Sequence, residues 1–197
     1  MIIAVVLAAG ESSRMGRAKA FLPFQGKTFI EAIVGALKQS KVGEIVVVLG
    51  HHAEEMKQRI EHLPVTIVIN RDYKNGQLSS LQAAIRHLST SPHAIDGILV
   101  HLVDHPYLNP ALVDRMIESF YAARKLIVVP RHLAKRGHPV IFSASLFDEL
   151  LQAPLNQGAK AVVNSHRAET LELDTDNAGI AIDIDTPEEY RQHVKED

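Results

Sequence analysis

Cysteine and tryptophan are absent from the 197 residues of this chain, and aromatic side chains make up only 5% of it. Without cysteine, disulfides, thiolate metal sites and cysteine nucleophiles are excluded. An excess of positive charge is also missing, because 21 Lys and Arg face 23 Asp and Glu, for a net charge of -2. Binding of nucleic acid without sequence preference depends on a basic surface, so nucleic acid is not an expected partner.

Long hydrophobic segments are lacking as well. The longest apolar stretch, residues 1–9, is too short to cross a bilayer of about 30 Å, and no basic residue precedes it. We therefore expect no membrane partner and a soluble, cytoplasmic protein. The length fits one ordinary domain of about 100–200 residues, and we expect a single domain over residues 1–197.

Short runs rich in β-branched residues alternate with helical patterns along the first two thirds of the chain. The runs predict buried strands at 2–7, 44–49, 65–69, 97–103 and 126–129. The patterns between them predict helices at 28–40, 53–62, 78–88 and 109–124. This alternation predicts an α/β fold, a three-layer α/β/α sandwich with a mostly parallel sheet and ligands at the carboxyl ends of the strands.

The last third has a looser pattern. It predicts strands at 139–142, 170–173 and 180–184, with helices near 143–151 and 158–166. A final helix is expected after Thr186, which begins a capping box with proline at the first helical position.

A basic, glycine-containing segment follows the first strand. Small residues around Gly10 and Gly16 let backbone amides approach an anion, and Arg14, Arg17 and Lys19 add positive charge, so a phosphate-binding loop is predicted. The spacing fits neither a Walker A loop nor a dinucleotide motif, since five residues separate the two glycines. Turn glycines beside solvated basic residues are the alternative interpretation.

Residues 7–26, LAAGESSRMGRAKAFLPFQG, resemble the signature loop of the nucleotidyltransferases related to the molybdenum cofactor cytidylyltransferases. Phe21 replaces a usual leucine. The resemblance implies a Rossmann-like nucleotidyltransferase fold whose loop wraps a nucleoside triphosphate, with Arg14 beside the outer phosphates and Lys19 beside the α-phosphate. Arg17 falls at a variable position. The loop residues expected to bind nucleotide are Leu7, Ala8, Ala9, Gly10, Arg14 and Lys19.

A second segment, residues 76–81, begins the helix predicted at 78–88. Its serine hydroxyls would cap the helix or bind a nucleotide, and the residues alone leave both roles open. The resemblance favours contacts to a pyrimidine ring by Gln77, Ser79 and Ser80.

Two groups of carboxylates point to a cation. Asp104 ends the strand predicted at 97–103, and one or two carboxylates with phosphate oxygens are the usual ligands of protein-bound Mg²⁺. Asp183 and Asp185 would share one face of the strand predicted at 180–184. The resemblance implies Mg²⁺ as cofactor, held by Asp104 and Asp185, with Asp183 as support or as the direct ligand.

Histidines stand near the first of these carboxylates. His101 and Asp104 would lie on opposite faces of a strand, so a histidine metal site is not expected there. His51 and His52 are expected on a surface loop.

Residues 137–142 match the family's Gly-x-Pro-Val-x-Phe strand, which lies on the side of the acceptor substrate. The resemblance therefore implies that Gly137, His138 and Pro139 bind the acceptor. Residues 158–160 are similar to a Gly-Ala-Arg segment of the family, but the Gly-Asp usually found before it is Asn156-Gln157 here. The resemblance thus divides the domain into a nucleotide-binding half, about 1–106, and an acceptor-binding half, about 107–197.

Branches of the family that use different nucleotides differ at the start of this loop. It reads Ala-Ala-Gly in cytidylyltransferases and Ala-Gly-Gly in guanylyltransferases. Ala9 indicates CTP, since its methyl group would crowd a purine. We therefore expect CMP transfer to the terminal phosphate of a molybdopterin-type cofactor carrying molybdenum, with Arg14, Lys19 and Asp104 catalytic. The client would be a molybdenum hydroxylase such as xanthine dehydrogenase.

Two alternatives stay open. In the first, the chain is a nucleotidyltransferase for another acceptor: a sugar phosphate, phosphocholine or methylerythritol phosphate. Transferases for these substrates share the loop at residues 7–26. Otherwise the chain would be a non-catalytic adaptor that carries the finished cofactor.

Overall fold

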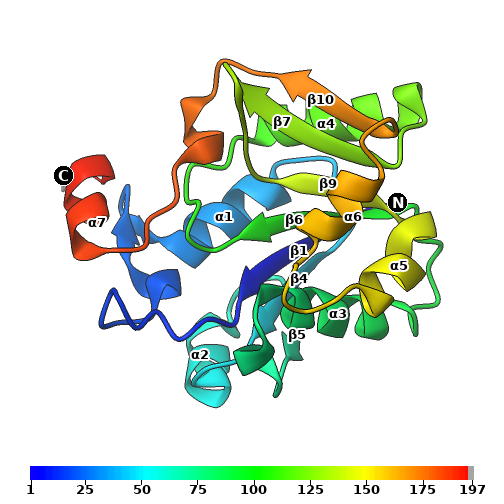
Figure 1. Cartoon of the computed structure of the whole chain (residues 1–197). Helices are drawn as coiled ribbons and strands as arrows, with labels where there is room; N and C mark the ends of the chain where they lie inside the picture. Colours follow the sequence, from blue (N-terminus) through cyan, green and yellow to red (C-terminus); the bar gives the residue numbers. More distant parts are fainter. Residues whose placement is uncertain (195–197) are drawn as a thin grey trace.

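The computed structural model describes residues 1–194, which form an eight-stranded mixed sheet with helices on both faces (Figure 1). The strand order is β10-β7-β9-β6-β1-β4-β5, with β8 paired to β7. β9 is antiparallel to β6 and β7, and β8 is antiparallel to β7; the other pairs are parallel. The strands are β1 (Ile2–Ala8), β4 (Ile45–Leu49), β5 (Thr66–Ile69), β6 (Gly97–Leu102), β7 (Ile127–His132), β8 (Lys135–Arg136), β9 (Val140–Ser143) and β10 (Thr170–Asp174).

Side chains of β1 alternate between two hydrophobic cores, one on each face of the sheet. Ile2, Ala4 and Val6 lie in the core that also contains side chains of α1 (Phe29–Lys38), α2 (Ala53–Ile60) and α4 (Pro110–Ala123). Their neighbours in β1 lie in the core shared with α3 (Gln77–Leu88), α5 (Phe147–Gln152) and α6 (Lys160–Ser165). Every β1 residue is buried, which explains its continuous apolar run. The predicted three-layer sandwich with a mostly parallel sheet is confirmed.

A third, smaller cluster joins the two ends of the chain. It packs the hairpin of β2 (Pro23–Phe24) and β3 (Lys27–Thr28) against the C-terminal helix α7 (Pro187–His193), and includes Phe24, Ile184 and Tyr190. In Figure 1 the red helix α7 accordingly lies beside the blue N-terminal segment. This cluster brings the segment after residue 180 to the loop that follows β1.

The helix starts predicted at Thr28, Asn109 and Thr186 are confirmed. Thr28 and Thr186 each form a complete capping box, and Asn109 accepts hydrogen bonds from the backbone at the start of α4. None of the helices within residues 1–194 is long and apolar enough to cross a membrane.

The strand predicted at 180–184 is wrong. A 3-10 helix, η4 (Ala178–Ala181), occupies its first half, and the rest is extended without a strand partner. The backbone makes isolated hydrogen bonds instead of a ladder: the Ile180 carbonyl accepts from His138 N at 2.9 Å, and Ile184 N donates to the Asp104 carbonyl at 2.9 Å. The argument that Asp183 and Asp185 share one face of a strand fails with it.

β1 pairs with β4 on one side and β6 on the other, and both pairs are parallel. The chain therefore winds in opposite directions from β1, and a crevice opens at the carboxyl ends of β1 and β6. The segment around Gly10 and the segment around Asp104 leave the sheet at this crevice.

The lack of a side chain at Gly50 lets two loops of this crevice approach each other closely. A Cβ atom at position 50 would lie 2.7 Å from the Ala9 carbonyl oxygen and 2.5 Å from Cβ of Tyr73. We expect Gly50→Ala to lower the free energy of unfolding by about 1–3 kcal/mol, because both neighbours must shift. Chemical denaturation measures this change.

Gly35→Ala provides the matched control. A Cβ atom there meets only Nζ of Lys27 at 3.8 Å, and alanine in the interior of α1 favours the helix, so stability should rise by about 0.5–1 kcal/mol. Equal effects of the two substitutions would contradict the close approach at Gly50.

Candidate active site

A lysine ammonium group joins two carboxylates at the carboxyl edge of the sheet. Nζ of Lys19 lies 3.1 Å from Oδ2 of Asp104 and makes a close ion pair with Oδ1 of Asp185. The Lys19 side chain is only 10% exposed. Three segments separated by 85 and 166 residues therefore meet at one positive charge.

Local structure fixes each member of this group. Lys19 begins the 3-10 helix η1 (Lys19–Phe21), and its backbone amide donates to Oγ of Ser12 at 3.3 Å. Asp104 follows β6, and its carbonyl accepts from Ile184 N. The capping box of α7 holds the third segment, since Oε2 of Glu189 accepts from the Asp185 amide at 2.8 Å.

Asp185 has two positively charged neighbours, Lys19 and Arg14. Burial by itself would raise the pKa of this carboxyl, but the hydrogen bond and charge of Lys19, with Arg14, outweigh it and hold the pKa below its usual value. Arg14 pairs closely with Oδ2 of Asp185 while its side chain is 67% exposed. Asp185 is thus an anion between two cations.

A first cavity of about 220 Å³ lies between the loop after β1 and the start of α3. It contains most of the residues predicted to bind nucleotide: Leu7, Ala8, Ala9, Gly10, Lys19, Gln77 and Ser80, together with Asp104. Met56, Tyr73 and Gly76 are among the other residues of its wall. Arg14 and Asp185 do not line it, although they reach Lys19, which does.

The two predicted serines differ in position. Ser79 does not line the cavity, and its hydroxyl donates to the carbonyls of Asp72 and Gly76. The buried side chain of Asn70 donates to both Ser79 and Ser80 and accepts from the Asp72 amide. Asn70 therefore shapes the turn before α3 from within.

A second cavity of about 550 Å³ adjoins the first and shares Leu7 and Gln77 with it. Of the three residues predicted to bind the acceptor, Gly137 and His138 line this cavity and Pro139 does not. Its floor is apolar, including Val100 and Phe142. Its rim carries polar side chains from three segments: Gln77, Arg136, Gln157, Lys160 and Asn164.

A cluster of three histidines, His101, His105 and His138, lies beside Asp104. The ring centroids of His105 and His138 are 5.0 Å apart, and those of His101 are 6.3 and 6.5 Å from the two. Burial, and secondarily the other imidazoles, lowers the pKa of His101 to about 3 and that of His138 to about 4. No group of three His, Asp or Glu side chains placed to hold a metal ion occurs within residues 1–194.

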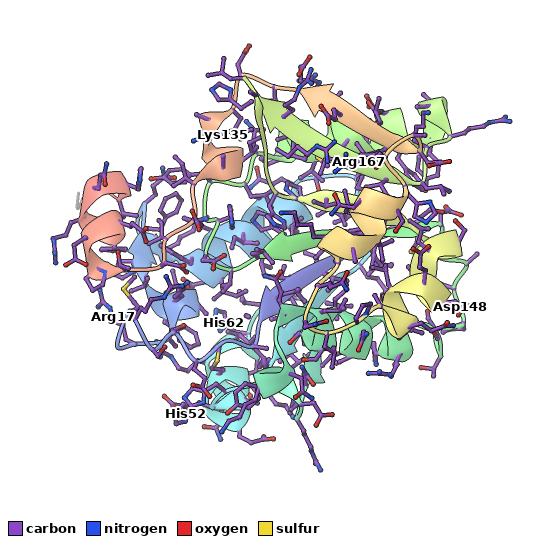
Figure 2. All side chains as sticks on the ribbon, viewed as in Figure 1. Arg17, His52, His62, Lys135, Asp148 and Arg167 are labelled. Atoms are coloured by element: carbon purple, nitrogen blue, oxygen red, sulfur yellow. The ribbon has the colours of Figure 1, made fainter. Side chains whose placement is uncertain are left out.

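Other predicted residues lie away from this centre. Asp183 is exposed and lines a separate groove with His132 and Lys135, so it does not join the carboxylates that Lys19 bridges. Arg17 lies beside α7, with its guanidinium 5.7 Å from the centre of the Tyr190 ring, and His52 lies at the surface near α2 (Figure 2).

Sequence reasoning assigned no role to Asn70, which shapes the turn before α3, or to Tyr73 and Arg136, which line the cavities. Asn70 directly follows the run that forms β5, and this place at a strand end was its only signal. Tyr73 and Arg136 have no local signal, because each reaches its cavity through the packing of distant segments.

The chain matches known proteins over nearly its whole length. The family model for the MobA-like NTP transferase domain matches residues 4–170. A nicotine blue oxidoreductase from Paenarthrobacter nicotinovorans is 32% identical, covering 96% of this chain and 95% of that protein. A molybdenum cofactor cytidylyltransferase from Escherichia coli is 27% identical, covering 94% and 92%.

A solved structure adds a comparison of fold and metal. Rv0371c from Mycobacterium tuberculosis, in complex with manganese, superposes with a TM-score of 0.81 at 28% identity, covering 98% of this chain and 97% of that one. The match of the family model spans the loop after β1, Asp104 and β9. This chain belongs to the MobA-like NTP transferase family of nucleotidyltransferases.

Proposed function

We propose that the protein transfers CMP from CTP to the terminal phosphate of a molybdopterin-type cofactor carrying molybdenum, with release of pyrophosphate, for a molybdenum hydroxylase client such as xanthine dehydrogenase. The observation that carries the proposal is the meeting of two adjoining cavities at Leu7 and Gln77, with Lys19 and Asp104 on the wall of the first. Such an arrangement brings a donor and an acceptor together at one reacting group.

The linings of the cavities support the proposed halves of the domain. The first cavity is built entirely from residues 7–104, and the second takes most of its wall from residues 129–164. A phosphorylated acceptor with a flat heterocycle suits the second, because its apolar floor would pack against a ring and its amide rim would bind polar edges.

Asp104 and Asp185 fit a divalent cation. Both carboxylates already contact the same ammonium group, and Oδ1 of Asp104 is buried with no hydrogen-bond partner among residues 1–194. Oxygen ligands from two carboxylates plus phosphates are the set that Mg²⁺ prefers. When bound there, Mg²⁺ would neutralise charge on the triphosphate. The manganese complex of a 28% identical relative supports this assignment.

In the proposed reaction an oxygen of the acceptor phosphate attacks the α-phosphorus of CTP in line. The new P–O bond forms as the bond between the α-phosphorus and the α–β bridging oxygen breaks, and pyrophosphate leaves with that electron pair. Lys19 moves from its carboxylates to the α-phosphate, and Arg14 binds the outer phosphates. The chain positions the reactants and neutralises charge, and forms no covalent bond itself.

Ala9 is the proposed determinant of the base. Its side chain lines the first cavity, and its carbonyl accepts from His51 N at 3.1 Å, which holds the backbone in place. A methyl group on this fixed wall disfavours the larger purine ring.

Asp104→Asn tests the reaction. With the molybdenum cofactor, CTP and Mg²⁺, the substitution should lower kcat/KM for pyrophosphate release by at least about a hundredfold, because a cation ligand is lost. Asp148→Asn, an exposed carboxylate on α5 (Figure 2), is the matched control. Oxidation of a nicotinamide cofactor without release of pyrophosphate would reject the proposal and favour an oxidoreductase, and tight cofactor binding without turnover would favour an adaptor.

Ala9→Gly tests nucleotide choice. Removing the methyl group widens the wall, so the ratio of kcat/KM for CTP to that for GTP should fall, with Ala94→Gly on an exposed loop as control. Pyrophosphate release with each nucleotide provides the measurement. An unchanged ratio would place base selection elsewhere.

Lys19→Met tests the ion pair between Lys19 and Asp185 through the pH dependence of the free energy of unfolding. The lowered pKa of Asp185 stabilises the folded chain above the ordinary aspartate pKa of 3.8, and this contribution is lost as the pH falls through the lowered value. The substitution removes the main cause of the shift. The difference in unfolding free energy from the unmodified chain should therefore be largest above about pH 4 and shrink below it. Lys57→Met, exposed on α2, is the control, and a difference independent of pH would contradict the assignment.

A further inference from the structure

Four buried side-chain atoms within residues 1–194 have no hydrogen-bond partner, and all four belong to one place in the fold. They are Nδ1 of His101, Oδ1 of Asp104, Nδ1 of His105 and Nδ1 of His138. Buried polar atoms without partners are uncommon in folded proteins, and their concentration at one point indicates a functional constraint. The point lies between the two cavities, because Asp104 lines the first and His138 the second.

The three histidines do not account for these atoms as a metal site of their own, since no three ligands converge there. His101 is already committed, because its Nε2 lies 2.8 Å from the His105 carbonyl oxygen. That hydrogen bond needs a proton on Nε2 and holds the backbone of the residue next to Asp104.

His105 is the imidazole that faces the carboxylate. Its Nε2 lies 3.8 Å from Oδ1 of Asp104, just beyond hydrogen-bond distance, while Oδ2 of the same carboxylate holds Lys19. An imidazole offers an N–H donor on Nε2 both in its Nε2–H tautomer and when it is protonated. The ring of His138 lies 5.0 Å behind that of His105 and limits its movement.

We propose that His105 is a positioning residue for the metal carboxylate: its Nε2–H donates to Oδ1 of Asp104 and orients Oδ2 toward the cation once Lys19 moves to the nucleotide. The inference rests on the proposed function for its cation. Carboxylates that ligate metals are commonly oriented by such outer hydrogen bonds, whose loss weakens metal binding about 10–100-fold. The same contact satisfies Oδ1, which otherwise remains buried without a partner.

Substitutions at position 105 separate hydrogen bonding from packing. His105→Gln retains an N–H donor, and His105→Met fills a similar volume without one. Mn²⁺ binding, measured by electron paramagnetic resonance with a non-hydrolysable CTP analogue present, should weaken about 10–100-fold in His105→Met and recover most of its affinity in His105→Gln. With saturating metal, KM for CTP should stay within about twofold of the unmodified protein while kcat recovers.

His87→Met, on an exposed turn of α3, is the matched control and should bind Mn²⁺ normally. Affinity within about twofold of normal in His105→Met would overturn the inference, and so would an equal loss in the Gln and Met variants.

A measurement on the unmodified protein is independent of any variant's folding. Nitrogen-15 NMR of the imidazoles with Mg²⁺ should find His105 as the Nε2–H tautomer, and the Nδ1–H tautomer would overturn the proposal. Loss of Mn²⁺ binding in Asp104→Asn establishes the metal site by itself. If none of the nucleotides tested then yields pyrophosphate, the proposed function fails. The Mn²⁺ affinities would still decide the role of His105.

Discussion

The candidate site depends on one electrostatic constraint, the repulsion between Asp104 and Asp185, which the ammonium group of Lys19 offsets by contacting both. These carboxylates come from the end of β6 and from the segment before α7, and the lysine from the loop after β1. The ion pairs of Lys19 with Asp104 and Asp185 therefore connect the loop after β1 to two distant parts of the chain. They also allow exchange, because the same two carboxylates suit a divalent cation when phosphate draws the ammonium away. A structural ion pair and a proposed reaction site thus use the same three side chains.

Local signals were enough to predict most of the fold. The capping boxes at Thr28 and Thr186 and the apolar run of β1 act through neighbours in sequence, and all three appear as expected. Residues 180–184 show where such signals fail. Their apolar character is real, since Ile180 and Ile184 are buried, but the hydrogen bonds of the backbone go singly to His138 and Asp104. Asp185 was predicted through a family resemblance, and the strand invoked to orient it does not exist.

The histidine cluster shows a second limit of sequence reasoning. Alternation along a strand gave no reason to associate His101 with Asp104, and it could not place His138 at all. The cluster forms because β9 runs antiparallel to β6, with Val140 opposite Val100, so that the residues before β9 lie beside the residues after β6. That pairing is a long-range property of the sheet. Local patterns therefore identified the carboxylate of the site, whereas the position of His138 beside it required the assembled fold.

The separation of the two cavities explains why family membership fixes chemistry more firmly than substrate. Lys19 and Asp104 line the first cavity, whose wall comes from the motif-rich first 104 residues. The second cavity is walled largely by the β7–β9 region and α6, where Gln157 stands within a departure from the family pattern. Since the two cavities share only Leu7 and Gln77 among residues 1–194, side chains of the second cavity can change without disturbing the loop after β1. A relative named as an oxidoreductase and another named as a cytidylyltransferase can therefore both resemble this chain along nearly its whole length. Under the proposed function, side chains of the second cavity such as Arg136 and His138 would select the acceptor, and the loop motif does not constrain them.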